Sequence, residues 1–275
     1  MYINLNIADI KIISEESYGN KVIFIYNGKK YYFKKSNNID NIYNELIACR
    51  IGKAMGISCC EYYPAEYNGF VGVVSEYYEN PKAISIEDYL KGKFKTDFSI
   101  HNNIIDLRDC FYMDFDELTA NRLTNDLIDI FMFDAIIGNA DRNITNYMII
   151  IDGENTRFAP LFDCENMLDD NAIYDGNYSL GVDEKDYKNK EENNILYKFL
   201  DWSDIEIYKR FLRYLELIKE EQIKEIFENI GKSMIIEDSI KNKILKKFEI
   251  NRSMITNYIN SYGIKKKKVW YNDVE

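Results

Sequence analysis

Three oxygen-bearing side chains stand close together in the stretch GNADRNITNYMIIIDGENTRFAPLFDCEN, residues 138–166. Asp141 lies in a loop after a long apolar segment, Asn146 follows five residues later, and Asp163 comes after a predicted hairpin. The hairpin consists of YMIII, the turn DGEN and TRFAPLF, so folding it about the turn brings Asn146 next to Asp163. Two carboxylates and an amide oxygen around one volume are hard ligands, which suit Mg²⁺ and suit transition metals badly.

The spacing of these residues also indicates a chemistry. A catalytic Asp, an Asn five residues later and a second Asp after a hairpin are the parts with which phosphoryl-transfer enzymes position a hydroxyl and hold a metal. The alternative is that Asp and Asn are present only because turns favour them.

A phosphate site also needs a cation, and Lys34 is the candidate. The tight turn Asn27-Gly28 joins the strands VIFIY and YYFKK, so Lys34 at the far end lies near the polar loop SEESYGN, which contains Gly19. Such a loop over phosphates with a strand lysine behind it can cradle a nucleotide. Alternatively, Lys34 is a solvated strand end.

Glu45 is the candidate partner of this lysine. It lies in the predicted helix NNIDNIYNELIACRIGKAMG, off the apolar stripe, and small residues follow it at helical spacing: Ala48, Cys49 and Gly52. These allow another element to approach closely, and a buried acid there needs a cation such as Lys34. The alternative is a tightly packed helix with Glu45 at its rim.

The elements that must position these residues change in type along the chain. Up to about residue 80 the sequence predicts a small antiparallel sheet with one helix. After Pro81 it predicts helices, among them a long one that ends near Gly138, then a turn-rich span over 169–194, then helices from an N-cap at Ser203. We therefore expect an α+β protein of two lobes, residues 1–80 and 81–275, with the hairpin in the second.

Asp134 interrupts the apolar stripe of that long helix, so it is a carboxylate on a core face. Two interpretations are equally open: an acceptor for the backbone of the loop at Asp141, or a partly exposed acid at a helix end. We do not assign it to the site.

The composition excludes several classes. A net charge of −11 argues against nucleic-acid binding over a broad surface, and the basic run at 265–268 fits a solvated tail better than a membrane or nucleic-acid contact. Five cysteines without CxxC spacing indicate a reducing compartment, and the one histidine, His101, removes imidazole-based chemistry. With no signal-peptide pattern and no long apolar run, we expect a cytoplasmic protein where it is made, without a membrane span.

With Lys34, Glu45, Asp141, Asn146 and Asp163 in this order, the chain resembles the HipA-like kinases, including the compact CtkA type. The resemblance lies in YYFKKS, NELIACRIGKAMGI, GFVGVVSEYY, FMFDAIIGNADRNITNYMIII and FAPLFDCENML. The catalytic-loop order, Asp-Arg then Asn, is also similar to that of phosphatidylinositol kinases. The resemblance implies a two-lobed protein-kinase-like fold that binds ATP and Mg²⁺.

By this resemblance Asp141 is the catalytic base, Asn146 and Asp163 hold Mg²⁺, Lys34 binds the ATP phosphates and Glu45 orients Lys34. Residues 75–78 are then the hinge, whose backbone, at Glu76 and Tyr78, contacts adenine beneath the loop that contains Gly19. Two positions depart from the family pattern. Asn143 stands where a His is usual, and Glu165 stands where a Gly is usual, which brings an extra acid close to the metal site.

The resemblance implies a protein Ser/Thr kinase with a protein hydroxyl as acceptor. The low Pro content and the many Lys, Ile, Asn and Tyr residues indicate an AT-rich bacterial genome. Ser14 and Ser17 are candidate acceptors for autophosphorylation. Three further questions stay open: whether an antitoxin binds the kinase, whether the kinase acts as a toxin, and whether it is exported to act on a host protein. One alternative is a kinase for small molecules or phosphatidylinositol lipids. Another is a degenerate kinase fold that only binds.

Overall fold

The computed structural model describes residues 2–6, 9–15, 21–93, 103–139, 142, 145–170 and 205–272. Six positions named above lie outside this set: Ser17, Gly19, His101, Asp141, Asn143 and Ser203. The turn-rich span is described only at its first two residues, Asp169 and Asp170.

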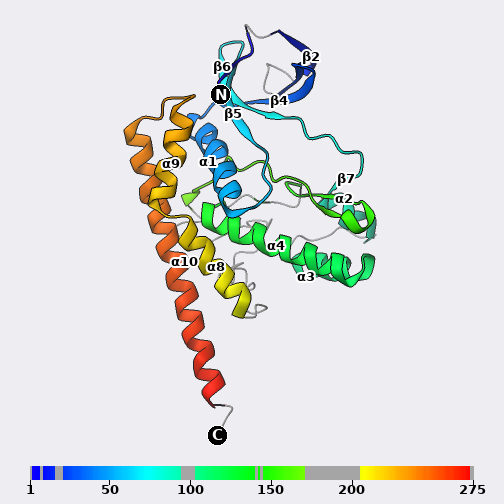
Figure 1. The fold of residues 1–275 in the computed structure, drawn as a ribbon, viewed down its shortest axis with the longest axis vertical. Coiled ribbons are helices and arrows are strands. Elements are labelled where there is room, and N and C mark those ends of the chain that lie inside the picture. The colour runs from blue at the N-terminus through cyan, green and yellow to red at the C-terminus, as the bar shows by residue number, and fades with distance from the viewer. Residues whose placement is uncertain are drawn as a thin grey trace.

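A six-stranded sheet occupies one end of the molecule, at the top of Figure 1, in the order β1-β5-β6-β4-β3-β2. Its strands are β1 (Ile3–Asn4), β2 (Ile10–Glu15), β3 (Lys21–Tyr26), β4 (Lys29–Lys35), β5 (Tyr62–Tyr67) and β6 (Phe70–Glu76). The pairings are antiparallel except that β1 runs parallel to β5. The sheet is therefore mixed, where the sequence predicted only antiparallel pairing, because β1 is too short to show a strand pattern.

The hairpin of β3 and β4 forms as predicted, with Asn27 and Gly28 both at positive φ, 49° and 75°. This is the turn geometry that matches the twist of two antiparallel strands. The sheet is curled, as a contact between two strands that are not neighbours shows. The Tyr67 hydroxyl in β5 donates to Glu15 Oε2 in β2, 3.2 Å away. The curl encloses a small apolar core of its own, which includes Phe33.

Gly72 in β6 lies against the strand that carries Lys34. A Cβ atom at this position would be 2.2 Å from the backbone oxygen of Lys34 and 2.8 Å from the Phe33 ring. Only a glycine lets the two strands approach this closely.

Helix α1 (Ile39–Met55) packs between the sheet and the C-terminal helices. The side chain of Asn38 accepts a hydrogen bond from the N–H of Asp40 and caps its start, and Gly56 at φ 79° ends it. Gly52 allows the predicted close approach, since a Cβ there would be 2.3 Å from Cys59 Sγ. The segment after α1 continues to the predicted hairpin, where Cys60 N–H donates to Leu161 O at 2.7 Å.

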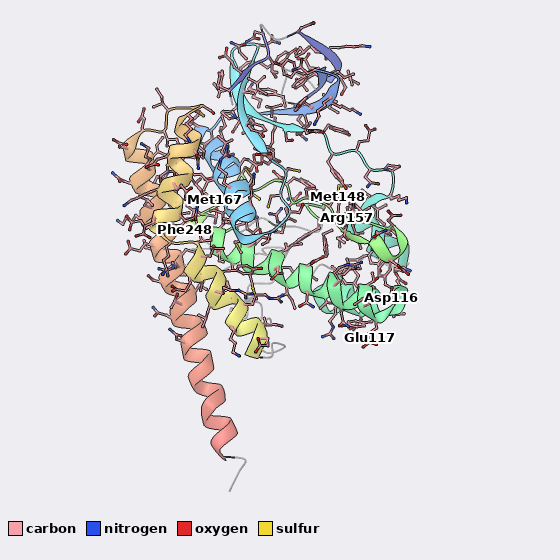
Figure 2. All side chains as sticks on the ribbon, viewed as in Figure 1. Asp116, Glu117, Met148, Arg157, Met167 and Phe248 are labelled. Carbon is pink, nitrogen blue, oxygen red and sulfur yellow. The ribbon has the colours of Figure 1, made fainter. Side chains whose placement is uncertain are left out.

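The predicted hairpin forms a second, three-stranded sheet of β7 (Ala83–Ser85), β8 (Met148–Ile150) and β9 (Arg157–Phe158). A short 3-10 helix (Gly153–Asn155) makes the turn between β8 and β9. Figure 2 labels Met148 and Arg157 on these two neighbouring strands.

Helices form the rest of the described chain and share one large apolar core with α1. They are α2 (Ile86–Lys93), α3 (Asn103–Asp114), α4 (Glu117–Ile137), α8 (Ile205–Leu217), α9 (Glu220–Gly231) and α10 (Asp238–Asn272). Helix α4 is the predicted long helix, capped by Asp116, which Figure 2 labels, and ended by Gly138 at φ 62°. Within the described residues, none of the helices combines the length and apolar character needed to cross a bilayer. The α+β class is thus confirmed, while the division near residue 80 stays a prediction.

Candidate functional site

Lys34 lies near the end of β4, and its amine meets three carboxylates. Its Nζ atom is 2.6 Å from Asp163 Oδ1, 2.8 Å from Glu165 Oε2 and 3.4 Å from Glu45 Oε1. The side chain is mostly buried. Burial acts to lower the pKa of the amine, but the charges of Glu45 and Asp163 outweigh it and raise the pKa above its ordinary value, so Lys34 stays charged.

Glu45 approaches Lys34 from α1 and is itself buried, with 2% of its side chain exposed. Its second oxygen accepts a hydrogen bond from the N–H of Cys164 at 2.9 Å. Burial raises the pKa of this carboxyl to about 7, against the lowering effect of Lys34 and of the Cys164 N–H. The predicted pair of Lys34 and Glu45 is therefore present, and Glu45 also holds the loop after β9.

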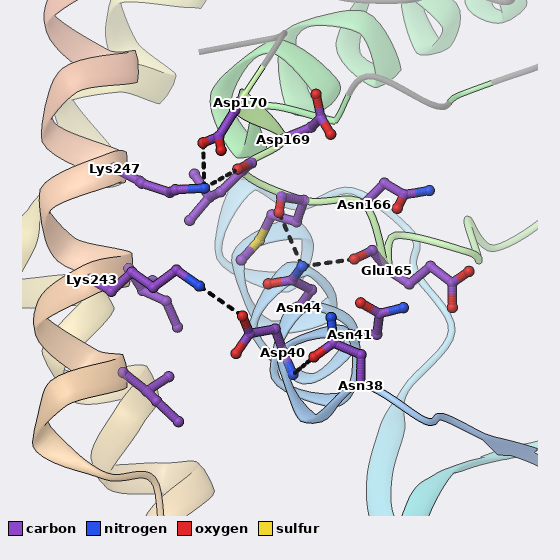
Figure 3. A pocket seen from close by; sticks show the side chains of 14 residues that line it. Asn38, Asp40, Asn41, Asn44, Glu165, Asn166, Asp169, Asp170, Lys243 and Lys247 are labelled. Carbon is purple, nitrogen blue, oxygen red and sulfur yellow. Dashed lines mark hydrogen bonds and ion pairs between the residues drawn. The ribbon is translucent and has the colours of Figure 1, made fainter. Parts of the chain in front are cut away.

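Asp163 lies in that loop with its backbone at φ 60°, a left-handed conformation that residues other than glycine seldom adopt. Helix α1 holds the following residues, because Asn44 Nδ2 donates to Glu165 O at 2.7 Å and to Met167 O at 3.0 Å (Figure 3). Met167 is buried in the main core, on the same side of the molecule as Phe248 of α10 (Figure 2). The loop that carries Asp163 is thus fixed by contacts from α1 and the core.

Glu45, Asp163 and Glu165 form a group of carboxylates whose ligand atoms lie within 4.8 Å of one another. Carboxylate oxygens are hard ligands of the kind Mg²⁺ takes, and Mg²⁺ usually needs only one or two of them. This donor set fits a magnesium ion better than a transition metal. Lys34 has contacts with all three, so an ion bound here would share these carboxylates with the amine.

Asn146 is buried and lies two residues before the first residue of strand β8, Met148. The antiparallel register pairs Ile149 with Phe158, and Ala159 N–H donates to Met148 O at 2.8 Å. Continued towards the loop, this register sets Asn146 across from Leu161, two residues before Asp163. The structure therefore places Asn146 and Asp163 at the same end of the hairpin, as the sequence indicated.

Glu76 and Tyr78 lie where β6 leaves the sheet towards β7. The Glu76 side chain is exposed and pairs with Lys29 at 2.8 Å, so it is directed at a neighbouring strand rather than at Lys34. Tyr77 N–H donates to Lys30 O at 2.8 Å and extends the pairing of β4 and β6 by one residue. Both predicted positions are thus part of the connection between the two sheets.

Arg142 is the residue that the sequence prediction missed. Its side chain is fully buried and pairs with Asp134 of α4, Nη2 to Oδ1 at 3.1 Å. Asn139 Nδ2 also donates to Asp134 Oδ1 at 3.1 Å. Asp134 is therefore buried rather than partly exposed, and its carboxylate forms an ion pair with a buried arginine rather than accepting only from the backbone. The signal was the carboxylate on the core face, which requires a cation somewhere in the fold.

Helix α10 supports α1 and the loop of Asp163 from outside. Lys243 pairs with Asp40 at 2.8 Å, and Lys247 pairs with Asp170 at 2.5 Å (Figure 3). Lys247 also donates to Leu168 O at 3.2 Å. Between these elements lies a polar cavity of about 400 Å³, which Glu165 also lines.

Comparison with known proteins gives structural neighbours only. No protein-family model matches the sequence, and no curated protein sequence matches it. The crystal structure of the Helicobacter pylori proinflammatory kinase CtkA matches with a TM-score of 0.70 and 17% identity, over 95% of this chain and 98% of that one. HipA of Shewanella oneidensis, in a complex with HipB and its operator DNA, matches with a TM-score of 0.61 and 14% identity, over 90% of this chain and 66% of that one.

Identities this low establish a shared fold rather than a shared activity. The chain has the fold of these two proteins, so the predicted HipA-like and CtkA-type kinase fold is confirmed. The roles of the individual site residues remain predictions.

Proposed function

We propose that this chain, which has the fold of CtkA and HipA, is an ATP- and Mg²⁺-dependent phosphotransferase that acts on a Ser or Thr hydroxyl of a protein. One observation carries the proposal: the amine of Lys34 meets both Glu45 and Asp163. These residues come from a strand, a helix and a loop far apart in the sequence, and a lysine with an orienting glutamate beside a metal-binding aspartate is the arrangement that phosphoryl transfer needs.

Lys34 and Glu45 form the phosphate-binding part. Glu45 is fixed through the Cys164 N–H and holds the amine of Lys34, whose strand position pairs with Lys21 at the start of β3. A lysine held in this way binds the phosphates of ATP as a point charge. Most of the catalytic effect then comes from position and charge rather than from covalent chemistry.

Asp163 and Asn146 are the proposed ligands of Mg²⁺, at the end of the hairpin. When bound, the ion supplies positive charge that offsets the charge of the phosphates. Asp163, 2.6 Å from Lys34 Nζ, would hold the ion together with Asn146. The donor of Lys34 that pairs with Asp163 would then be available to phosphate, while Glu45 would still orient the amine.

The connection after β6 is the proposed adenine site. Because pairing partners alternate along an antiparallel strand and Tyr77 N–H bonds to Lys30 O, the backbone groups of Glu76 and Tyr78 are directed away from β4. On this side the pairing of β5 and β6 ends at Ser75, and beyond it the Glu76 carbonyl and the Tyr78 backbone are proposed to meet the edge of an adenine ring. The Glu76 side chain is held by Lys29 and has no part in this contact.

Asp141 is proposed as the group that orients the acceptor hydroxyl and takes its proton, on the basis of its sequence position alone. A protein acceptor is preferred because the net charge of −11 is unfavourable for approach to an anionic lipid surface. The proposal includes a partner protein that acts as an antitoxin, as HipB is the partner of HipA. It also includes two places of action, the cytoplasm or, after export, a host protein.

One observation favours the alternative of a fold that binds without catalysis. Lys34 is surrounded by three carboxylates, one of them Glu165, which the family pattern lacks. If these contacts persist with ATP, the amine cannot reach phosphate.

Transfer of labelled phosphate to protein acceptors tests the proposal. Purified wild type, Lys34→Met and Asp163→Asn are incubated with ATP and Mg²⁺, with Lys30→Met as the control. Lys30 is on the same strand but pairs with the exposed Glu79. We expect the first two variants to lose at least about a hundredfold in rate and the control to keep its rate.

Mass spectrometry of the wild type, including the exposed Ser14, locates any self-labelling, and lipid and small-molecule acceptors are tested in parallel. Absence of both nucleotide-induced stabilisation and transfer in the wild type would favour the binding-only fold.

A further inference from the structure

Arg142 makes an unusual number of contacts for a buried charge. Its Nε and Nη2 atoms each donate to Asp134, at 3.1 Å to Oδ2 and to Oδ1. Its Nη1 donates to Phe162 O, and its Nη2 also donates to Cys164 Sγ at 3.1 Å. None of its side chain is exposed. Donors on all three nitrogens of the guanidinium are thus used.

These contacts lie on both sides of one residue. Phe162 and Cys164 flank Asp163, whose backbone has φ 60°. A non-glycine residue keeps that conformation only where its surroundings hold it. Arg142 holds the carbonyl before Asp163 and the sulfur after it, while Glu45 holds the Cys164 N–H.

Stability alone does not account for a buried arginine here. Well-packed apolar residues in place of a buried ion pair are often as stable or more stable, because both charges lose their hydration. What the guanidinium offers is a rigid fork that reaches several acceptors in one plane, which neither an apolar residue nor a lysine reproduces. Asp134 neutralises the charge and fixes the orientation of the fork.

We propose that Arg142 is a positioning residue for Asp163. Its guanidinium, oriented by Asp134, sets the backbone on both sides of Asp163 and so directs that carboxylate to the volume beside Lys34. The inference rests on the proposed function, in which Asp163 is a metal ligand. Partners of this kind that orient a metal ligand typically change metal affinity by about 10- to 100-fold when they are removed.

The test measures binding rather than turnover. Mn²⁺ replaces Mg²⁺ as a probe, and its dissociation constant is measured by titration in the presence of a non-hydrolysable ATP analogue. Affinity for the analogue without metal and the free energy of unfolding are measured on the same samples. The variants are Arg142→Lys and Cys164→Ala, and the matched control is Cys110→Ala, which removes another buried thiol.

We expect Arg142→Lys to weaken Mn²⁺ binding by about tenfold, with metal-free affinity for the analogue unchanged. Cys164→Ala leaves the ion pair in place and removes one acceptor, so a change of about twofold to fivefold in the same direction is expected. Cys110→Ala should leave Mn²⁺ binding as in the wild type.

Unchanged Mn²⁺ affinity in a folded Arg142→Lys protein would overturn the proposal while leaving the proposed function intact. If Arg142→Lys does not fold, the two cysteine variants decide, and equal effects from both would overturn it. A wild type that binds neither Mn²⁺ nor the analogue would refute the proposed function and this inference together.

Discussion

Replacing Glu165 with Gln should tighten the binding of ATP. The Lys34 amine has three N–H donors and lies within 3.4 Å of three carboxylates, so a phosphate must displace one of them. Glu45 is fixed by a backbone N–H, and Asp163 is a ligand of the metal in the proposed complex. Glu165, 2.8 Å from the amine, is then the group that competes with phosphate for Lys34.

The size of the effect follows from this contact. A hydrogen bond between charged groups contributes about 1.5–3 kcal/mol. Glu165 is 30% exposed and Lys34 19% exposed, so solvent screening reduces the expected contribution to about 1–2 kcal/mol. A free-energy difference of that size corresponds to roughly 5- to 30-fold in the dissociation constant. Gln keeps the size of the side chain and removes its charge.

Equilibrium titration of a non-hydrolysable ATP analogue at saturating Mg²⁺ measures the effect. Glu216→Gln is the control, because Glu216 is also a glutamate paired with cations but lies on the exposed surface by Lys219 and Arg252. We expect tighter binding for Glu165→Gln alone. Weaker binding would refute the reasoning, since it would mean that Glu165 supports the metal or the phosphates rather than competing with them.

Three further predictions concern stability, each measured by urea unfolding. Gly72→Ala should destabilise the folded protein by about 1–3 kcal/mol, because the new Cβ clashes with the backbone of β4. Gly92→Ala is the control and should not destabilise it, because no atom lies within 4 Å of a Cβ at that position. Equal effects of the two substitutions would contradict the clash. Glu45 has its pKa raised from 4.5 to about 7, so the folded state keeps a proton that the unfolded state releases, and stability should fall as pH rises from 5 to 8, by at most about 3 kcal/mol. In Glu45→Gln that fall should disappear, and its persistence would assign it to other groups. Asn251→Ala removes two buried hydrogen bonds to α4 and should lower the free energy of unfolding by about 1–3 kcal/mol. Asn229→Ala, on the surface, should lower it little. An Asn251→Ala protein as stable as the wild type would show that α10 packs on α4 without these hydrogen bonds.

Local signals in the sequence predicted much of the fold. The Asn27-Gly28 turn and the glycine ends of α1 and α4, Gly56 and Gly138, appear where the sequence indicated them, because each requires a positive φ that few other residues adopt. A proline inside a run of strand residues usually interrupts the strand, yet β5 continues through Pro64. At that residue β5 pairs only with β6, and a strand with one free side tolerates a missing N–H.

Contacts across long sequence distances were harder to predict. The pair of Lys34 and Glu45 could be predicted from the sequence, because a buried acid needs a cation and the neighbouring strand contains one. Arg142 was not identified, since its partner on α4 and its acceptors after β9 come together only in the folded chain. The sequence shows that Glu165 departs from the family pattern, which has a Gly at this position. It does not show the contact of Glu165 with Lys34, because that contact depends on the conformation of the loop after Asp163.

The support that α10 gives to α1 has a consequence for protein synthesis. Lys243 and Asp40 are 203 residues apart in sequence, and the Tyr43 hydroxyl bonds to Ile235 O, 192 residues away. Since the ribosome makes the N-terminal residues first, a nascent chain that stops before α10 lacks the ion pair between Lys243 and Asp40 of α1. The packing around α1, which carries Glu45, is therefore complete only once α10 has been made.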